Sequence, residues 1–330
     1  MFKELVRTAV LWGLLSSSVI AGPAVGLLED PQVQTFIDEM VDRHQFDRVV
    51  LQSIFEQAHV QDGILKAIAS PYEAKPWYQY RPLFVTDKHV QRGVEFWKAH
   101  KESLDAAEHY YGIPPEMIVA ILGIETRYGS NTGNHKVLDA LSTLAFKYPP
   151  RSKFFRQELE QFLLLVKEED LDLFDLKGSY AGAIGAPQFI PSSYRHYAVD
   201  FSGTGHRDLF HDMDDVIGSV ANYFAKHGWE KNKPVAVPVH AMQPLEGLAA
   251  PRNNPKPNYK AGELIPQGID VPKSIRKEQV ALIELEGENG PEYWLGAKNF
   301  YVITRYNHSS LYGMAAFQLS QEIKKQFDKS

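Results

Sequence analysis

Apolar residues recur every three or four positions through most of the chain, which is the spacing of one buried face of an α-helix. Apolar positions such as Val33, Ile37 and Ile64 predict short helices in the first part of the chain. The pattern then predicts further helices at residues 87–111, from 114–115 onward, and at 153–168, 216–224 and 314–327. Gly112 is expected to end the first of these, because glycine readily adopts the left-handed conformation found after a helix. We therefore expect a mainly helical protein.

Two stretches depart from the helical period. Residues 71–84 contain three prolines among aromatic residues, and proline disfavours a helix there, which predicts extended or looped chain. In the last third of the chain the apolar period falls to two, which predicts strands at residues 235–239, 280–282 and 300–304. Residues 251–260, with three prolines and three asparagines, predict a loop. A small β-rich unit is therefore expected beside the helical body.

The charge balance and the absence of cysteine disfavour several classes of protein. Thirty-five Lys and Arg residues against 41 Asp and Glu leave a net charge of −6, which offers no electrostatic reason to expect a nucleic acid as partner. The sequence has no cysteine, so disulfides, thiolate zinc sites, iron–sulfur clusters, a cysteine nucleophile and a lipid-modified N-terminal cysteine are not expected. The chain can therefore fold unchanged in an oxidising compartment.

The first 21 residues have the order of charged and apolar residues found in a secretory signal. Lys3 and Arg7 precede the uncharged run 8–20, and Ala21 is a small residue after which cleavage is expected. About 13 uncharged residues are too few for the roughly 20 that cross a bilayer as a helix. We expect a soluble, exported protein from which residues 1–21 are removed. An uncleaved signal that tethers the protein is the alternative.

Glu125 is the most conspicuous carboxylate, because it follows eight consecutive non-ionisable residues, 117–124, in a helix that must be largely buried. Burial would raise its pKa, so that the carboxyl group could stay protonated near neutrality and act as the general acid of a glycosidase. An ion pair with Arg127 or Lys136, where the helix reaches solvent, explains the same spacing. The spacing by itself leaves both interpretations open.

Residues 178–189 gather three glycines and three alanines around a few polar side chains. Glycine allows a bulky ligand to approach the backbone, although tight packing of two helices explains the composition equally well. The stretch matches neither a dinucleotide-binding motif nor a P-loop. Aromatic residues also lie beside amides or arginines at residues 78–81, 148–151 and 304–309, a combination that suits the apolar face and hydroxyl rim of a sugar ring. Core packing explains many of these aromatics.

An acidic stretch in the middle of the chain has the alternating oxygen donors of a calcium-binding loop, at Asp200, Ser202, Thr204 and His206, before aspartates that end at Asp215. The match is incomplete, because no glutamate occupies the twelfth position. A solvated acidic loop is an equal alternative. The histidines show no His-Glu-x-x-His arrangement, so a catalytic zinc is not expected.

Four separated motifs together resemble those of the lytic murein transglycosylase B family. They follow the family's order and cover nearly the whole chain after the signal, at residues 123–129, 178–194, 217–224 and 301–309. Four motifs in one order are far more specific than any one of them. The resemblance implies a mainly α (α+β) fold, with a lysozyme-like helical core, an N-terminal α domain and a small β domain.

The resemblance also implies a division of the chain and the residues of the site. The expected parts are the signal at 1–21, an N-terminal α region at 22–80, the catalytic core at 81–230, the β-rich domain at 231–300 and a C-terminal segment at 301–330 that returns to the helical body. Glu125 matches the single catalytic acid and base. Positions that line the substrate groove are matched by Tyr80, Arg151, Ser179, Gln188, Tyr223, Tyr306, Asn307 and Tyr312. The family's calcium loop is matched by Asp200, Ser202, Thr204, His206 and Asp215, with Thr204 where an aspartate is usual and one extra residue before Asp215.

The implied activity is cleavage of the β-1,4 bond from MurNAc to GlcNAc in the glycan strands of periplasmic peptidoglycan, with formation of 1,6-anhydromuramic acid. Glu125 would protonate the linking oxygen and then accept the proton of the muramoyl C6 hydroxyl, so that no water is consumed. No cofactor is required. The resemblance leaves calcium binding open, because the loop at residues 200–215 departs from the family's calcium loop. The expected enzyme is a monomer whose partner is peptidoglycan and no nucleic acid; enzyme partners in the envelope are unknown. A lysozyme-like hydrolase and a catalytically idle peptidoglycan-binding protein are the alternatives.

Overall fold

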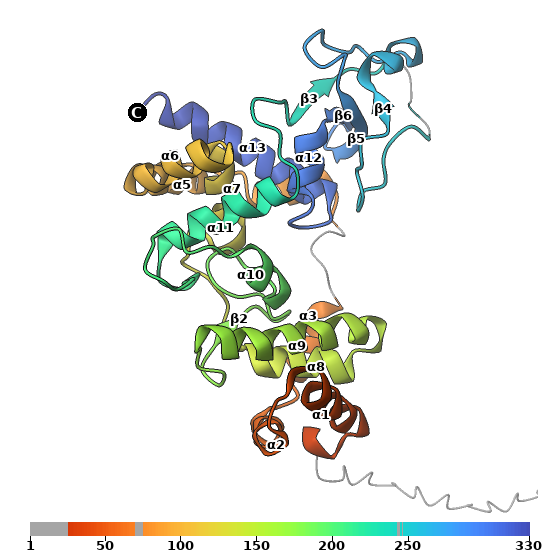
Figure 1. Ribbon diagram of the computed structural model, residues 1–330. Coiled ribbons are helices and arrows are strands. Elements are labelled where there is room, and N and C mark those ends of the chain that lie inside the picture. The colour runs from red at the N-terminus through yellow and green to blue at the C-terminus, as the bar shows by residue number, and fades with distance from the viewer. Residues whose placement is uncertain (1–25, 70–74, 243–244, 246) are drawn as a thin grey trace, which may run out of the picture. The chain divides into compact units, whose positions relative to one another are not determined.

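The computed structural model describes residues 26–69, 75–242, 245 and 247–330. The expected signal peptide, residues 1–21, lies outside the described residues. Within the described part of the chain no helix is long and apolar enough to cross a membrane. The chain divides after Gln57 into two compact units (Figure 1). The second unit begins inside the region 22–80 that the resemblance assigns to an N-terminal domain, and the functional division of the chain stays a prediction.

The first unit is helical, as its apolar spacing predicts. It contains η1, α1 and α2, at Leu27–Glu29, Pro31–His44 and Arg48–Gln57. The side chain of Asp30 accepts a hydrogen bond of 2.9 Å from the amide of Gln32, which satisfies one of the free N–H groups at the start of α1. Phe36 and Phe55 meet edge to face, with ring centroids 5.9 Å apart. Each helix therefore packs an aromatic ring against the other.

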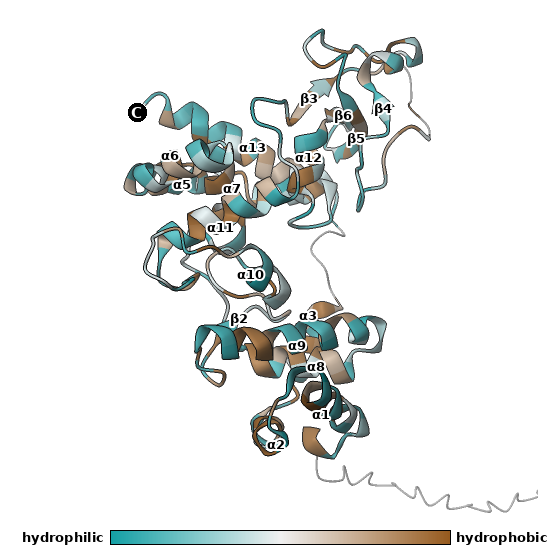
Figure 2. Ribbon diagram, viewed as in Figure 1, coloured by the Kyte–Doolittle hydropathy of each residue, from teal (hydrophilic) through white to brown (hydrophobic). Residues whose placement is uncertain are grey.

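The second unit has a helical body. The helices span Asp62–Ile68 (α3), Trp77–Tyr80 (α4), Asp87–Ala99 (α5), Lys101–Tyr111 (α6), Pro115–Thr126 (α7), Val137–Lys147 (α8), Ser152–Glu169 (α9), Pro191–Tyr197 (α10), Met213–Lys226 (α11), Lys298–Ile303 (α12) and Ser310–Phe327 (α13). α7 packs against α5, α6, α11 and α13 (Figure 1). Its residues 117–122 are all apolar and buried (Figure 2). The helices expected from 114–115 onward and at 153–168, 216–224 and 314–327 are confirmed.

The single long helix expected over 87–111 is wrong, because the chain leaves the helical conformation at His100. A φ of −118° and a ψ of 29° at this residue separate α5 from α6. Phe96 before the break and Leu104 after it are buried, whereas Tyr110 near the end of α6 is 75% exposed. Neither glycine nor proline marks the break, so the sequence carries no local signal for it.

Part of the proline-rich stretch is helical, contrary to the expectation of extended or looped chain. Pro76 is the N-cap residue of α4, and Pro82 lies at the start of the 3-10 helix η3, Arg81–Leu83. Proline is tolerated at the first turn of a helix because the N–H that it lacks has no intrahelical partner there. The prolines at 76 and 82 therefore begin helices instead of preventing them.

Four antiparallel strands form the larger sheet, in the order β3-β6-β5-β4. Strands β3 to β6 span Ala236–Val239, Tyr259–Lys260, Gln279–Gly287 and Gly290–Gly296. The strands expected at 235–239 and 280–282 are confirmed, whereas the sequence pattern misses β6 because glycine and proline begin it. The strand expected at 300–304 is wrong, since most of these residues form α12. Phe300 and Val302 are fully buried there, and burial overrides a weak β preference.

Both faces of this sheet are buried, which explains the nearly continuous apolar run of β5. Leu282 and Leu295 pack into a cluster on one face. Ala281 and Ile283 alternate with them and pack on the other face, because successive side chains of a strand point to opposite sides. The second cluster also contains Trp77, Tyr80, Phe300, Leu311 and Met314. It therefore joins the sheet to α4, α12 and α13.

Helices α5 and α7 approach each other closely around the side chain of Tyr128. Its hydroxyl donates a hydrogen bond of 2.7 Å to the carbonyl oxygen of His89 in α5. A Cβ added at Gly123 of α7 would lie 2.7 Å from the Tyr128 hydroxyl oxygen, and one at Gly93 of α5 would lie 2.8 Å from it. Both distances are too short for a packed carbon, so both helices need glycine here.

Gly123→Ala should destabilise the protein by about 1–3 kcal/mol, because the added methyl group forces Tyr128 or α5 to move. Gly63→Ala is the matched control, since Gly63 lies in α3 with nothing within 4 Å of an added Cβ. Alanine there should stabilise by about 0.4–1 kcal/mol. Urea unfolding of both variants measures the contrast, and equal effects of the two substitutions would contradict the close approach.

Candidate active site

Glu125 lies in the last turn of α7, where the buried helix reaches a cleft. Of the eight residues before it, all except Ile124 are buried, while Glu125 is partly exposed. The buried hydroxyl of the next residue, Thr126, donates a hydrogen bond of 2.8 Å to the carbonyl of Ala186. This bond ties the end of α7 to the segment 178–189 and thereby fixes where the Glu125 carboxyl group lies.

The cleft has a volume of about 440 Å³, and its walls come from parts of the chain that are far apart in sequence. They are the end of α7, the 3-10 helix η4 (Pro149–Arg151) with the start of α9, the segment after Gly185, α11 and the residues after α12. The lining side chains are Glu125, Arg151, Phe154, Gln188, Phe189, Ile190, Ser193, Tyr223, Arg305, Tyr306, Asn307 and His308. Among these described residues Glu125 is the only carboxylate.

A buried tyrosine holds the carboxyl group of Glu125. The hydroxyl of Tyr312, in α13, donates a hydrogen bond of 2.6 Å to Oε1 of Glu125. The ring of Tyr312 stacks on that of Tyr306, with centroids 6.5 Å apart and planes 10° from parallel. The Tyr306 hydroxyl in turn donates a hydrogen bond of 2.6 Å to the carbonyl of Pro187. The two rings therefore connect Glu125 to the same part of the segment 178–189 that Thr126 contacts, one residue further along.

The same tyrosines stay protonated. Burial raises the pKa of Tyr312 and of Tyr306 well above 10, and the charge of the nearby Glu125 raises both further. Burial also raises the pKa of Tyr223, whose hydroxyl donates a hydrogen bond of 2.6 Å to the carbonyl of Arg305. All three phenols therefore act as neutral hydrogen-bond donors and not as bases.

The glycines of the segment 178–189 serve close packing, and a polar residue of the same segment lines the cleft. A Cβ at Gly182 would lie 2.4 Å from Cδ2 of Leu141, and one at Gly185 would lie 2.6 Å from a backbone carbonyl oxygen. Gln188 adopts a φ of 52°, and its side-chain amide donates hydrogen bonds of 3.0 Å to the carbonyls of Thr132 and Gly185. The glycines thus serve close packing, although of a non-helical segment and not of two helices. Approach of a ligand to this backbone stays a prediction.

The structure brings most of the expected site residues together. Those that line the cleft are Glu125, Arg151, Gln188, Tyr223, Tyr306 and Asn307, and Tyr312 contacts Glu125 directly. Tyr80 is 2% exposed and packs in the core beside the sheet, and the Ser179 hydroxyl accepts hydrogen bonds from the amides of Ala181 and Ala183. Neither Tyr80 nor Ser179 is among the lining side chains. Their contact with a substrate stays a prediction.

Several lining residues are not predicted by the sequence reasoning. They are Phe154, Phe189, Ile190, Ser193, Arg305 and His308. Arg305 and His308 belong to the aromatic and basic stretch 304–309 noticed in the sequence, so the motif marks the right place without marking these side chains. The others carry no distinctive local sequence signal, because the sequence does not distinguish a phenylalanine or isoleucine that lines a cleft from one that packs in a core.

Oxygen atoms of the expected calcium loop lie close together, but backbone amides bind its carboxylates. The Ser202 hydroxyl lies 3.5 Å from Oδ1 of Asp200 and 3.4 Å from the Thr204 hydroxyl, which lies 3.5 Å from the carbonyl oxygen of His206. The Asp200 carboxylate accepts hydrogen bonds from the amides of Gly203, Thr204 and Gly205, at 2.8, 2.9 and 2.7 Å. These bonds, led by that from Gly205, lower the pKa of Asp200. In the described part of the chain no group of three or more His, Cys, Asp or Glu side chains could hold a metal.

The second carboxylate of the loop is also used by the backbone. Buried Asp215 accepts hydrogen bonds on Oδ1 from the amides of Phe201 and Ser202, at 2.8 and 2.9 Å, and on Oδ2 from the amide of Asp208 at 2.9 Å. Thr204 offers a neutral hydroxyl where a charged donor would strengthen a site. The loop therefore offers a calcium ion fewer charged ligands than a loop with an aspartate at position 204 would.

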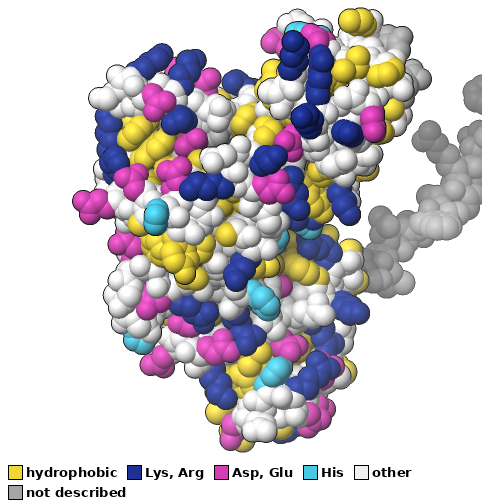
Figure 3. Space-filling model, turned by 45° about the horizontal axis from the view of Figure 1, so that its top comes forward, with side chains coloured by type: hydrophobic (Ala, Val, Ile, Leu, Met, Phe, Trp, Pro, Cys, Tyr) yellow, Lys and Arg dark blue, Asp and Glu magenta, His cyan; other side chains and the backbone are white. Residues whose placement is uncertain are grey.

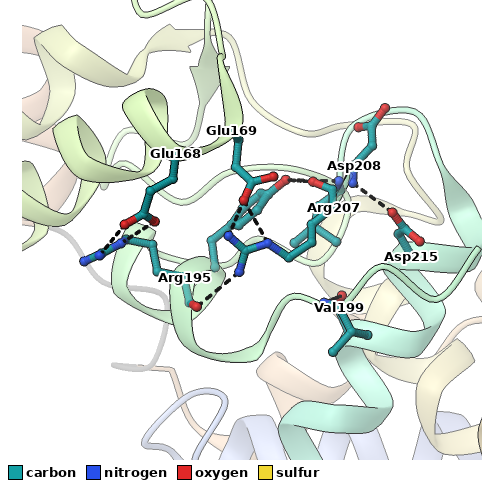
Figure 4. A network of polar contacts seen from close by, with 10 residues as sticks. Glu168, Glu169, Arg195, Val199, Arg207, Asp208 and Asp215 are labelled. Carbon is teal, nitrogen blue, oxygen red and sulfur yellow. Dashed lines mark hydrogen bonds and ion pairs between the residues drawn. The ribbon is translucent and has the colours of Figure 1, made fainter. Parts of the chain in front are cut away.

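Two arginines, one in the loop and one in α10 before it, bind glutamates at the end of α9 (Figure 4). Arg207 donates a hydrogen bond of 2.8 Å from Nε to Glu169, at the end of α9. Arg195 of α10 binds Glu168 through two hydrogen bonds, of 2.9 and 2.6 Å. The Tyr194 hydroxyl also donates to the carbonyl of Arg207. Ion pairs and amide–carboxylate hydrogen bonds therefore shape this loop.

The fold and the cleft around one carboxylate define the class of the protein. The sequence profile of the transglycosylase SLT domain matches residues 29–321. The chain belongs to this family of transglycosylases. The resemblance drawn from the four motifs is thereby confirmed.

Three relatives show how closely the chain follows the family. The membrane-bound lytic murein transglycosylase B of Escherichia coli (strain K12) is 46% identical over 305 residues, which are 89% of this chain and 83% of that protein. The structure of soluble lytic transglycosylase SltB1 from Pseudomonas aeruginosa has a TM-score of 0.84 at 46% identity, covering 90% of this chain and 99% of that one. The Escherichia coli transglycosylase Slt35 in complex with calcium has a TM-score of 0.83 at 44% identity, covering 91% and 95%. The expected mainly helical, lysozyme-like fold is confirmed.

Asp215→Ala should destabilise the protein by at least about 3 kcal/mol, because three backbone amides lose their acceptor. Asp215→Asn keeps one oxygen for the amides of Phe201 and Ser202 and should cost less, about 1 kcal/mol. Thermal unfolding of the two variants without added metal measures the difference. A parent-like melting temperature for Asp215→Ala would show that the carboxylate does not organise the loop.

Proposed function

We propose that the chain is a lytic transglycosylase that cleaves the β-1,4 bond between MurNAc and GlcNAc of peptidoglycan and leaves a 1,6-anhydromuramic acid end. The observation that carries the proposal is that Glu125 is the only carboxylate among the described residues lining the cleft, with Oε1 held by Tyr312. Glycosidases with two carboxylates place the second about 5–9.5 Å from the first. Relatives named as lytic transglycosylases support the one-carboxylate chemistry.

In the first step Glu125 would act as a general acid. Its carboxyl group donates a proton to the oxygen that joins MurNAc to GlcNAc, and the bond from that oxygen to the muramoyl C1 breaks. The carbonyl oxygen of the substrate's own 2-acetamido group stabilises the positive charge at C1. The substrate therefore supplies the group that a second carboxylate supplies in other glycosidases.

In the second step the ionised Glu125 would act as a general base. It accepts the proton of the muramoyl C6 hydroxyl, whose oxygen bonds to C1 and closes the anhydro ring. Glu125 regains its proton and no water is consumed. Because the attacking hydroxyl belongs to the same sugar, its effective concentration at C1 far exceeds that of a free nucleophile.

Tyr312 would position the carboxyl group through both steps. Its pKa is raised well above 10, so it keeps its proton and donates to Oε1 whether Glu125 is charged or neutral. Tyr223, Gln188 and Asn307 line the same cleft and would contact the sugar rings, which present both apolar faces and hydroxyl groups. The rings of Tyr223 and Tyr306, with centroids 4.9 Å apart, give this wall its apolar character.

The cellular setting follows from the substrate. Peptidoglycan lies outside the cytoplasmic membrane, so an enzyme that cleaves it must be exported. Residues 1–21 have the order of charged and apolar residues that directs export, and we expect their removal in the periplasm. The enzyme would act there as a soluble monomer on glycan strands.

Glu125→Gln should lower the release of anhydro-muropeptides from peptidoglycan by at least about 100-fold, because glutamine can neither donate nor accept the proton in either step. Mass spectrometry of the digest measures both the amount and the identity of the product. Folding should survive, since glutamine keeps the size of the side chain and removes a charge from a partly buried position.

Glu116→Gln is the matched control. Glu116 lies in the first turn of the same helix, burial raises its pKa, and it does not line the cleft. Its substitution should leave anhydro-muropeptide release within about twofold of the parent, since no proton passes through it. Retained release by Glu125→Gln would remove Glu125 from the mechanism, and reducing-end products from the parent would make the enzyme a hydrolase.

Calcium has no step in this proposal. The Slt35 structure was determined in complex with calcium. In this chain, however, Thr204 is neutral and the carboxylates of Asp200 and Asp215 each accept three backbone hydrogen bonds. We infer that the loop binds calcium weakly and holds its shape without it.

Calorimetric titration should show a calcium dissociation constant in or above the range of about 10⁻⁴–10⁻³ M for the parent protein. Thr204→Asp adds one charged donor and should tighten binding by about tenfold or more, whereas Thr204→Val should not. Tight binding by the parent, well below micromolar, would contradict the inference.

A further inference from the structure

Two arginines line the same cleft as Glu125, and aromatic rings support both of them. The guanidinium carbon of Arg151 lies 4.4 and 5.2 Å from the ring centroids of Phe154 and Phe155. That of Arg305 lies 4.1 Å from the ring centroid of Tyr301. A ring beneath a guanidinium group holds it in place without neutralising its charge.

Neither arginine has a carboxylate partner among the described residues. In the described part of the chain the Nε of Arg305 is buried without a hydrogen-bond acceptor, and its Nη2 makes a long contact of 3.4 Å with the Thr304 hydroxyl. Buried polar groups nearly always have partners, so the guanidinium group of Arg305 keeps hydrogen-bonding capacity for a ligand in the cleft. For a guanidinium group that ligand is an anion.

The excess of positive charge is a local property of the cleft. Burial lowers the pKa of His308, another lining residue, and the charges of Arg305 and Arg151 lower it further. Whole-chain charge has the opposite sign, at −6. On the face drawn in Figure 3, basic and acidic side chains are intermixed. The cleft therefore carries a charge that its sugar-binding role alone does not require.

We propose that Arg305 and Arg151 bind a carboxylate on the muramic acid branch of the substrate and so favour strands with acidic branches over strands with neutral ones. The inference rests on the proposed function. Sugar rings with hydroxyl and acetamido groups are neutral. The lactyl ether of muramic acid, by contrast, ends either in its own carboxylate or in a stem peptide that carries carboxylates. The planar guanidinium fork matches a carboxylate through two parallel hydrogen bonds.

The position of Arg305 gives this contact a role in the reaction. Arg305 precedes Tyr306, and Tyr306 stacks on the tyrosine that holds Glu125. A branch anchored at Arg305 would therefore restrict how the muramoyl ring lies beside Glu125. Restricting a reactant to its productive orientation lowers the barrier, so the contact would raise kcat/KM for branched strands specifically.

The test uses three preparations of the same glycan strands with the full-length mature enzyme. The first carries stem peptides, the second has them removed by an amidase so that lactyl carboxylates are free, and the third has those carboxylates converted to neutral methylamides. Initial rates of anhydro-product formation give kcat/KM for each. The parent enzyme should prefer a carboxylate-bearing preparation over the methylamide by about tenfold or more.

Arg305→Gln should lose about tenfold or more in kcat/KM on the preferred carboxylate substrate, and a clearly smaller factor on the methylamide. Arg305→Lys keeps the charge and should recover part of the loss. Lys260→Gln, an exposed residue of β4 outside the cleft, controls for loss of one positive charge. Arg151→Gln, at an exposed position, should repeat the pattern and keeps the test decisive if Arg305→Gln does not fold.

Each outcome has one meaning. If the arginine variants lose kcat/KM only on peptide-bearing strands, the arginines bind a stem-peptide carboxylate. If they lose it only on amidase-treated strands, the arginines bind the lactyl carboxylate. Equal loss on all three substrates, or no loss on either carboxylate substrate, would overturn the inference. Failure of the proposed function is separate, because it would appear as absence of anhydro ends in the products of the parent enzyme.

Discussion

Burial of α7 on all sides is the constraint on which the rest of the structure depends. An apolar helix can be buried only if other elements cover every face, and α5, α6, α11 and α13 do so here. Glycine at positions 93 and 123 lets α5 approach α7 around Tyr128. The first charged side chain after the apolar run, Glu125, therefore emerges at a point defined by packed helices and not by a loop. A catalytic group needs such a fixed position, because misplacement by about 1 Å can cost two orders of magnitude in rate.

The cleft extends this rigidity through aromatic packing. Tyr312, Tyr306 and Tyr223 each use their hydroxyl group in a hydrogen bond of 2.6 Å, two of them to backbone carbonyls and one to Glu125. Their rings pack on one another and on Phe189. The polar ends of these buried side chains are thus satisfied while the rings shape an apolar wall. This arrangement combines a partly buried acid with a groove that must accept hydrated sugars.

The loop before α11 illustrates a different way to hold irregular backbone. Amide groups need acceptors, and Asp200 and Asp215 supply them, while Arg207 anchors the loop to α9 and Arg195 joins α10 to the same helix. A metal ion could organise the same carboxylates in another chain. Here the carboxylate oxygens are turned toward backbone N–H groups, so a neutral residue at 204 is compatible with a folded loop.

The sequence by itself determined most of the helices, the mainly helical class and the position of Glu125 at the end of an apolar helix. Helix periodicity and short motifs depend on residues that are neighbours in the sequence. Only the tertiary structure decided the break at His100, the helical state of residues 298–303 and the helical start at Pro76. The same is true of the hydrogen bond between Tyr312 and Glu125, which are separated by 187 positions. Burial against residues distant in sequence sets each of these features. Local propensity does not depend on residues that become neighbours only when the chain folds.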